Sequence, residues 1–212
     1  MNDKFFVFDE VLTPTEHAAL FQHLRKVQWS SQWSSTTGRA DGKYSHAWHW
    51  NYTFYRSVQS MPAITEEEYQ QMIIEHPPID ALWKKVSALV TEYVGKHDIL
   101  RLYSNCNPYG TNAYVHKDDG DYTAVYYPAV VWDTEWEGGT CFYEEDENME
   151  LDAIRYVSYK PNRLIIFPAQ VPHRGMPVDR ACTDPRYVIA MKLQRNVNDP
   201  EYVKEYYNAK ST

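Results

Sequence analysis

The sequence predicts an α+β fold: a double-stranded β-helix (jelly roll) with N-terminal helices packed on one of its sheets. Two observations predict it. In the N-terminal half, two segments place apolar residues three and four positions apart, which is helical spacing. From Ile99 onward, short apolar segments alternate with turn residues, which is typical of two facing sheets with helices on one outer face. We expect one domain over residues 1–212, with 1–98 as helical support and lid and 99–194 as the jelly-roll core.

The first elements are a short strand and a helix. Phe5–Phe8 is an apolar run typical of a strand. Thr13 is a predicted helix N-cap, with Pro14 at the first helical position and Glu16 at the third, which is the capping-box pattern. Apolar and aromatic residues then follow at helical spacing: His17, Leu20, Phe21, Leu24 and Val27.

Residues 29–56 are rich in aromatic side chains but show no sustained period. We therefore expect an irregular segment that forms a substrate-facing lid, because loops over a rigid scaffold often carry substrate contacts. The alternative is that its tryptophans are ordinary packing against the sheet; these are Trp29, Trp33, Trp48 and Trp50.

A second helix is predicted from Pro77, and Gly95 is its expected end. Its apolar face comprises Ile79, Leu82, Trp83, Val86, Leu89, Val90, Tyr93 and Val94. Eight strands are expected after it, at 99–105, 111–117, 121–128, 139–143, 154–159, 163–167, 171–175 and 186–194.

Composition excludes some classes of partner. The net charge of −8 argues against a general nucleic-acid or anionic-membrane binder, since both need a basic surface. No run of about 18 apolar residues is present, so we expect no membrane span. The three cysteines form no Cys-x-x-Cys pair, which suits reduced thiols and predicts a cytoplasmic location. The oligomeric state cannot be predicted from the sequence.

A candidate metal site comprises His116, Asp118 and His173. Two imidazoles and a carboxylate are the facial triad that binds non-haem Fe(II) and leaves positions open for a co-substrate and O₂. His116 and Asp118 are two residues apart, so in a strand end they would point the same way. His173 follows the apolar run Leu164–Phe167, and Arg186 opens the next apolar stretch.

This ordered set resembles the 2-oxoglutarate/Fe(II)-dependent dioxygenases, and within them the prolyl 4-hydroxylase-like branch. The resemblance covers roughly residues 99–194. The matching motifs are Leu102-Tyr-Ser, His116-Lys-Asp, Trp132-Asp-Thr-Glu-Trp, Gly138-Gly-Thr-Cys-Phe, Arg163-Leu-Ile-Ile-Phe-Pro, Val171-Pro-His and Arg186-Tyr.

Two departures from the family pattern are visible. The turn reads Glu137-Gly-Gly-Thr140, where the family more often has Gly-Gly-Glu-Thr. The spacing from His173 to Arg186 also exceeds the usual family value, which makes Arg180 a rival for the role of the arginine. We prefer Arg186 because Arg-Tyr followed by small and apolar residues fits a core strand.

The resemblance implies Fe(II) as the metal, 2-oxoglutarate as co-substrate and ascorbate as a stimulant. It implies His116, Asp118 and His173 as catalytic metal ligands. It also implies that Arg186 binds the distal carboxylate of 2-oxoglutarate, with Tyr103 or Tyr114 as a hydroxyl donor.

The implied activity is hydroxylation of an unactivated C–H bond. The substrate could be a small molecule, such as an amino acid or sugar, or a peptidyl-prolyl type. The alternative is a metal-binding jelly roll without redox chemistry, such as a cupin-like isomerase or a sugar-binding module.

Overall fold

The computed structural model describes residues 4–34, 48–56, 64–111 and 113–195. Their helices are α1 (Pro14–Leu24), α2 (Glu66–Glu75), α3 (Pro77–Val94) and the short 3₁₀ helix η1 (Thr134–Trp136). Their strands are β1 (Phe6–Phe8), β2 (Ser30–Ser34), β3 (Trp48–Arg56), β4 (His97–Asn107), β5 (Tyr122–Tyr127), β6 (Thr140–Glu145), β7 (Leu151–Val157), β8 (Arg163–Pro168), β9 (His173–Gly175) and β10 (Arg186–Arg195).

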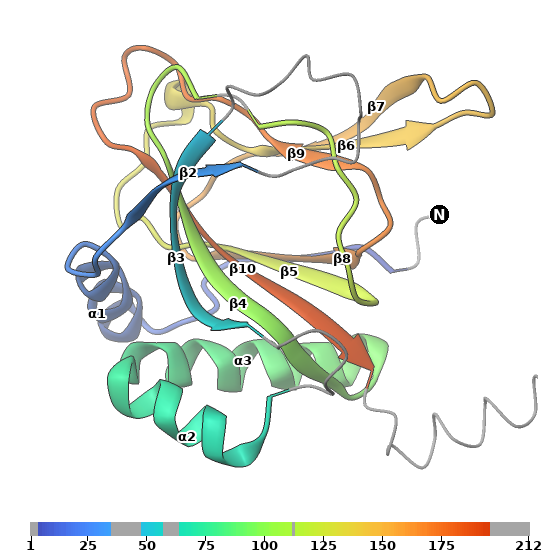
Figure 1. Ribbon diagram of the computed structural model, residues 1–212. Coiled ribbons are helices and arrows are strands. Elements are labelled where there is room, and N and C mark those ends of the chain that lie inside the picture. Colours follow the sequence, from blue (N-terminus) through green and yellow to red (C-terminus); the bar gives the residue numbers. More distant parts are fainter. Residues whose placement is uncertain (1–3, 35–47, 57–63, 112, 196–212) are drawn as a thin grey trace, which may run out of the picture.

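Two antiparallel sheets face each other (Figure 1). The larger sheet has seven strands in the order β1-β8-β5-β10-β4-β3-β2, and the smaller has three in the order β7-β6-β9. Helices α2 and α3 lie beneath the larger sheet, and the β6–β7 hairpin projects from the smaller one. This arrangement confirms the predicted jelly roll with helices on one sheet.

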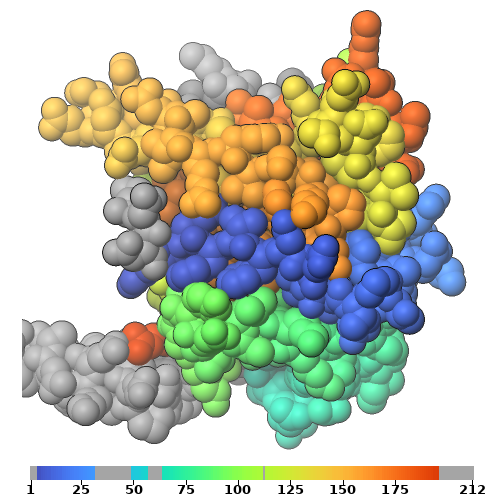
Figure 2. Space-filling model, turned by 180° about the vertical axis from the view of Figure 1, so that it is seen from behind, coloured from blue at the N-terminus to red at the C-terminus, as the bar shows by residue number. Residues whose placement is uncertain are grey.

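Two apolar cores lie on the two faces of the larger sheet. Because side chains alternate along a strand, β5 sends Ala124 and Tyr126 to the helix side and Val125 and Tyr127 to the space between the sheets. The helix-side core is closed by the apolar face of α3. From behind, α2 and α3 form the bottom layer, the N-terminal segment with α1 the middle, and the smaller sheet lies at the top (Figure 2).

Most predicted elements are confirmed, and one helix was missed. Helix α1 has the expected capping box, in which Thr13 and Glu16 bond reciprocally. Helix α3 starts at Pro77, as predicted, and Gly95 caps its end with a φ of 88°. Helix α2 was not predicted, although Thr65 and Glu68 form a second capping box.

The prediction that residues 29–56 are irregular is wrong for the part that the structure describes. Strand β3 pairs with β4 along most of its length, and β2 pairs with β3. Trp29 packs against the helix-side core, and its ring lies 5.7 Å from that of Tyr187, which supports ordinary packing for this tryptophan. Residues 35–47, where a lid is still expected, lie outside the described residues.

Two of the predicted strands differ in the structure. The expected strand over 111–117 is reduced to an isolated bridge between His116 and His173. The expected strand over 154–159 is β7, which begins at Leu151 and ends at Val157. No helix in the described part of the chain is long and apolar enough to cross a membrane.

We predict that Leu82→Ala lowers the free energy of unfolding by about 2–5 kcal/mol, because it leaves a cavity where α3 packs under the larger sheet. Leu82 is fully buried. Denaturant unfolding followed by circular dichroism measures the change. The exposed Lys85 on the same helix is the control, and Lys85→Ala should shift the midpoint little.

Candidate metal centre

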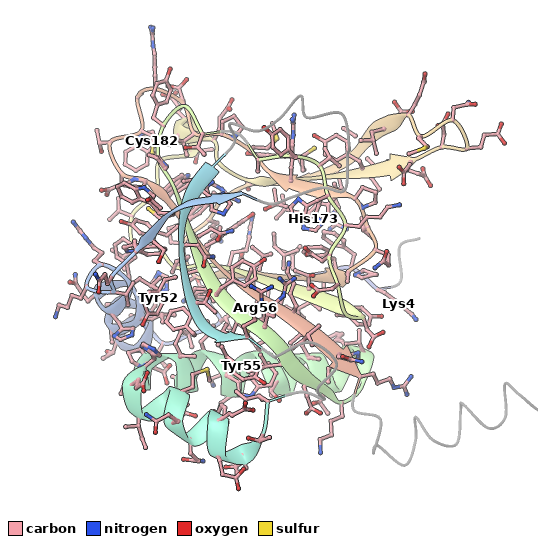
Figure 3. All side chains as sticks on the ribbon, in the orientation of Figure 1. Lys4, Tyr52, Tyr55, Arg56, His173 and Cys182 are labelled. Carbon is pink, nitrogen blue, oxygen red and sulfur yellow. The ribbon has the colours of Figure 1, made fainter. Side chains whose placement is uncertain are left out.

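His116, Asp118 and His173 converge in the space between the two sheets. Their candidate ligand atoms all lie within 4.8 Å of one another. The Nε2 atom of His116 is 3.5 Å from Oδ1 of Asp118, and the Nε2 atom of His173 is 3.2 Å from Oδ2. Figure 3 labels His173 on β9, where the smaller sheet faces the larger one.

A backbone bridge brings the two histidines together. The amide of His116 donates to the carbonyl of His173 at 3.0 Å, and the amide of His173 donates back at 2.9 Å. Asp118 is held in turn by its own amide, which donates to the carbonyl of Ala169 at 2.8 Å. The three side chains are therefore positioned by main-chain bonds and not by a regular strand at 111–117.

Both imidazoles have a defined tautomer. Nδ1 of His116 donates to the carbonyl of Tyr114 at 2.8 Å, and Nδ1 of His173 donates to the carbonyl of Val171 at 2.9 Å. The proton on Nδ1 leaves the lone pair of each Nε2 directed at the other ligand atoms. A backbone carbonyl that orients a histidine in this way is the usual outer support of a metal ligand.

The ionisation of the cluster also suits a cation. Burial and the neighbouring His173 lower the pKa of His116 to about 4, so this imidazole is neutral near pH 7. Burial opposes ionisation of Asp118, but Lys192 and His173 outweigh it and hold the pKa of Asp118 well below its usual range. Neutral imidazole and ionised carboxylate are the forms that bind metal.

A cleft runs from this cluster along β10 and β4. The pairing of these strands places Arg186 opposite Asn107, Val188 opposite Asn105, and Ala190 opposite Tyr103. All six line the cleft. Val188 and Ala190, whose side chains are small, line the cleft on β10 between Arg186 and Lys192.

Arg186 lies at the far end of this cleft and is buried. Its Nε donates to the carbonyl of Gly138, and its Nη2 donates to the carbonyl of Gly139 at 3.3 Å. A Cβ at Gly175 would lie only 2.8 Å from Nη1, so a larger residue there would displace the guanidinium. Nη2 also lies 3.4 Å from Oγ1 of Thr140, so several bonds hold the guanidinium beside the start of β6. Arg180, the rival in the sequence, is exposed in a loop.

Tyr127 is a residue that sequence reasoning missed. It is fully buried on β5, and its ring centroid lies 5.8 Å from the guanidinium carbon of Arg186. Its hydroxyl is 2.7 Å from Oγ1 of Thr140, which also lines the cleft. Alternation along β5 could have placed Tyr127 between the sheets, but with 18 tyrosines in the chain nothing in the sequence singled it out.

The two predicted tyrosines lie away from Arg186, and a role for either in binding 2-oxoglutarate stays a prediction. Tyr103 lines the cleft, but it lies opposite Ala190, about 13 Å along β10 from Arg186. It lies near Lys192, whose Nζ is 5.6 Å from its ring centroid. Tyr114 is not among the described residues that line the cleft, and it supports His116 through its carbonyl instead. Neither tyrosine is placed to share a carboxylate with Arg186.

The β3 side of the cleft is polar. Nδ2 of Asn51 donates to Oδ1 of Asn105 at 2.8 Å, and Asn105 and His49 both line the cleft. Burial lowers the pKa of His49 to about 4, so its ring is neutral. Nε2 of His49 is buried with no hydrogen-bond partner in the described residues, so it is available to a polar ligand.

Lys192 is the second residue that sequence reasoning missed. It is 2 % exposed, lines the cleft, and forms an ion pair with Oδ2 of Asp118. The sequence did contain a signal for Lys192: it lies six positions after Arg186, so in a strand both residues occupy the same face.

A larger groove of about 660 Å³ lies elsewhere, between α2, α3 and the start of β4. No histidine or cysteine of the described chain lines it. The smaller cleft, with its metal-ligand cluster and buried arginine, is the better candidate for chemistry.

The family model described as "2OG-Fe(II) oxygenase superfamily" matches residues 103–193. This segment belongs to the 2OG-Fe(II) oxygenase superfamily. The match contains every residue of the candidate metal cluster as well as Arg186. No curated protein is detectably similar in sequence to the chain.

Several solved structures share the fold of this oxygenase at low identity. A 2OG-Fe(II) oxygenase-family oxidoreductase from Burkholderia pseudomallei has a TM-score of 0.63 and 10 % identity, covering 92 % of this chain and 87 % of its own. The epimerase SnoN from nogalamycin biosynthesis has a TM-score of 0.61 and 12 % identity, with coverages of 94 % and 84 %. A viral collagen prolyl hydroxylase from Paramecium bursaria Chlorella virus-1 has a TM-score of 0.56 and 14 % identity, with coverages of 92 % and 98 %.

The matched segment is that of a 2-oxoglutarate-dependent dioxygenase, a family whose cofactor is Fe(II) and whose co-substrate is 2-oxoglutarate. The described residues fit both groups. Two oriented imidazoles and an ionised carboxylate match Fe(II). The buried guanidinium of Arg186, which lines the cleft, matches the distal carboxylate of 2-oxoglutarate.

We predict that His116→Ala and His173→Ala each weaken Fe(II) binding by more than about 100-fold, since loss of a mere outer support already costs roughly 10–100-fold. Anaerobic isothermal titration with Fe(II) measures the affinity. His97→Ala, which removes a buried histidine outside the cluster, is the control. Wild-type affinity in both ligand variants would contradict the metal assignment.

We predict that Arg186→Gln raises the apparent KM for 2-oxoglutarate at least about 100-fold, because breaking a buried charge pair costs about 3–5 kcal/mol. Fe(II) affinity should stay nearly unchanged. Arg180→Gln is the matched control and should leave the KM unchanged. The reverse result would make Arg180 the anchor of the co-substrate.

Proposed function

We propose that the protein hydroxylates an unactivated C–H bond of a small molecule or a peptidyl substrate. The observation that carries the proposal is the cleft, in which a two-histidine, one-carboxylate cluster and a buried arginine lie at opposite ends. Bound Fe(II), with 2-oxoglutarate and O₂, supplies the chemistry that replaces hydrogen by hydroxyl while 2-oxoglutarate becomes succinate and CO₂.

His116, Asp118 and His173 are proposed to hold the iron through the Nε2 atoms and the carboxylate. The carbonyls of Tyr114 and Val171 keep both imidazoles in the metal-binding tautomer. This support holds the ligand geometry without movement when the metal binds.

Arg186 is proposed to bind the distal carboxylate of 2-oxoglutarate, and Tyr127 and Thr140 to contribute hydroxyl groups beside it. Val188 and Ala190 are proposed to flank the carbon chain. A dianion held at both ends in this way is oriented along the cleft, and the buried walls exclude water from it.

Asp118 favours hydroxylation over halogenation, because a halogenase replaces this acid with a small residue to make room for chloride. The family match favours redox chemistry over the cupin-like or sugar-binding alternative. Prolyl hydroxylases and an epimerase share the fold, so the fold leaves both peptidyl and small-molecule substrates open.

We predict a weak visible charge-transfer band when the protein receives Fe(II) and 2-oxoglutarate without oxygen. Exposure to air with substrate should then release succinate in proportion to hydroxylated product. Candidate substrates are free amino acids, sugars and prolyl peptides. For each one, the succinate released with the candidate is compared with the succinate released without it. Absence of the band at saturating Fe(II) would contradict the proposed function.

A further inference from the structure

Lys192 is a fully buried cation at the metal end of the cleft. It lies on the same face of β10 as Arg186, and a register shift in the pairing with β4 follows it directly. Its Nζ pairs with one oxygen of Asp118, Oδ2, and interacts with Tyr103. Burial of a lysine is unfavourable without such partners, and an apolar side chain would fill the same volume more easily. Packing alone therefore does not explain a lysine here.

A second donor binds the same carboxylate oxygen. Thr123 lies directly opposite Lys192 in the pairing of β10 with β5. Its Oγ1 donates to Oδ2 of Asp118 at 2.7 Å. Two neighbouring strands of the larger sheet thus hold one side of the carboxylate.

The other carboxylate oxygen has a different environment. Oδ1 of Asp118 faces Nε2 of His116 at 3.5 Å, and neither Lys192 nor Thr123 bonds to it. Nε2 of His173 lies on the Oδ2 side at 3.2 Å. The carboxylate is therefore asymmetric: one candidate metal-binding histidine faces each oxygen, but only Oδ2 also accepts from two protein donors, Lys192 and Thr123.

We propose that Lys192 is a positioning residue which, with Thr123, restricts Asp118 to binding the metal through one oxygen. This inference rests on the proposed metal assignment. A facial triad leaves positions for the two ligand atoms of 2-oxoglutarate and for O₂. A carboxylate that bound through both oxygens would occupy one of those positions. By holding Oδ2, Lys192 keeps the position open for the co-substrate.

The positive charge of Lys192 also favours binding of the co-substrate, although it disfavours binding of the metal. It competes with the metal for Asp118 and so weakens metal binding. It also attracts the dianionic co-substrate once the metal is bound, because charge interactions are strong in a buried cleft. Removal of the charge should therefore change the two affinities with opposite signs, which a purely structural role would not do.

The test compares Lys192→Met, Lys192→Arg and Thr123→Val with the wild type under argon. Fe(II) affinity is measured by isothermal titration. The affinity for 2-oxoglutarate is then measured on the Fe(II)-loaded protein from its visible charge-transfer band. We expect Lys192→Met to bind Fe(II) as tightly as the wild type or more tightly, and to bind 2-oxoglutarate at least ~10-fold more weakly. Lys192→Arg should restore most of the 2-oxoglutarate affinity.

Thr123→Val removes the other donor to Oδ2 without a change in charge, so it should weaken 2-oxoglutarate binding less than Lys192→Met does. It also keeps the test decisive if Lys192→Met fails to fold. Lys117→Met is the matched control: this exposed lysine lies between two of the ligands in sequence, but it pairs with Glu145. It should bind both Fe(II) and 2-oxoglutarate like the wild type.

The outcomes separate the two proposals. If the wild type itself neither binds Fe(II) nor develops the band, the proposed function fails. If the wild type does both and Lys192→Met and Thr123→Val keep its 2-oxoglutarate affinity within twofold, only the role of Lys192 fails. Parallel losses of Fe(II) and 2-oxoglutarate affinity in Lys192→Met would also overturn it, because they indicate a general structural defect.

Discussion

The main-chain bridge between His116 and His173 is the interaction on which the rest of the site depends. Two mutual amide-to-carbonyl bonds, at 3.0 and 2.9 Å, join a segment next to the larger sheet to a strand of the smaller one. Without this bridge, two imidazoles from distant parts of the chain would have no common position. The metal cluster therefore lies where the two sheets are joined, and its geometry follows from main-chain bonds.

The chemistry of the cleft follows from how its buried charges are compensated. Asp118 is ionised because Lys192 stabilises its charge, and the buried Arg186 lies at the other end of the cleft. Between them, β10 presents small side chains, and β3 and β4 present a polar wall with an unpartnered His49 nitrogen. The cleft thus has a buried arginine at one end and the candidate metal cluster at the other.

Much of the fold could be predicted because local patterns agreed with it. The Thr13 capping box, the apolar face of α3 and the strand alternation of β10 all have local causes. Helix α2 was missed because its face is weakly apolar, with Met72 as its only buried residue among those described. Strand β3 was missed although its aromatic residues alternate with polar ones from Trp48 to Phe54, because the surrounding segment 29–56 as a whole shows no sustained period. Its pairing with β4 shows that the alternation belongs to a strand.

The sequence by itself predicted the candidate ligands His116, Asp118 and His173 together with Arg186, from their residue types and their order along the chain. Only the tertiary structure decided which neighbours support them. Tyr127 and not Tyr103 lies beside Arg186, and Lys192 and Thr123 meet on one oxygen of Asp118. The physical reason is that such contacts depend on strand register and on the approach of the two sheets. Strand register and the approach of the sheets are set by pairing between distant segments, which local sequence patterns do not predict.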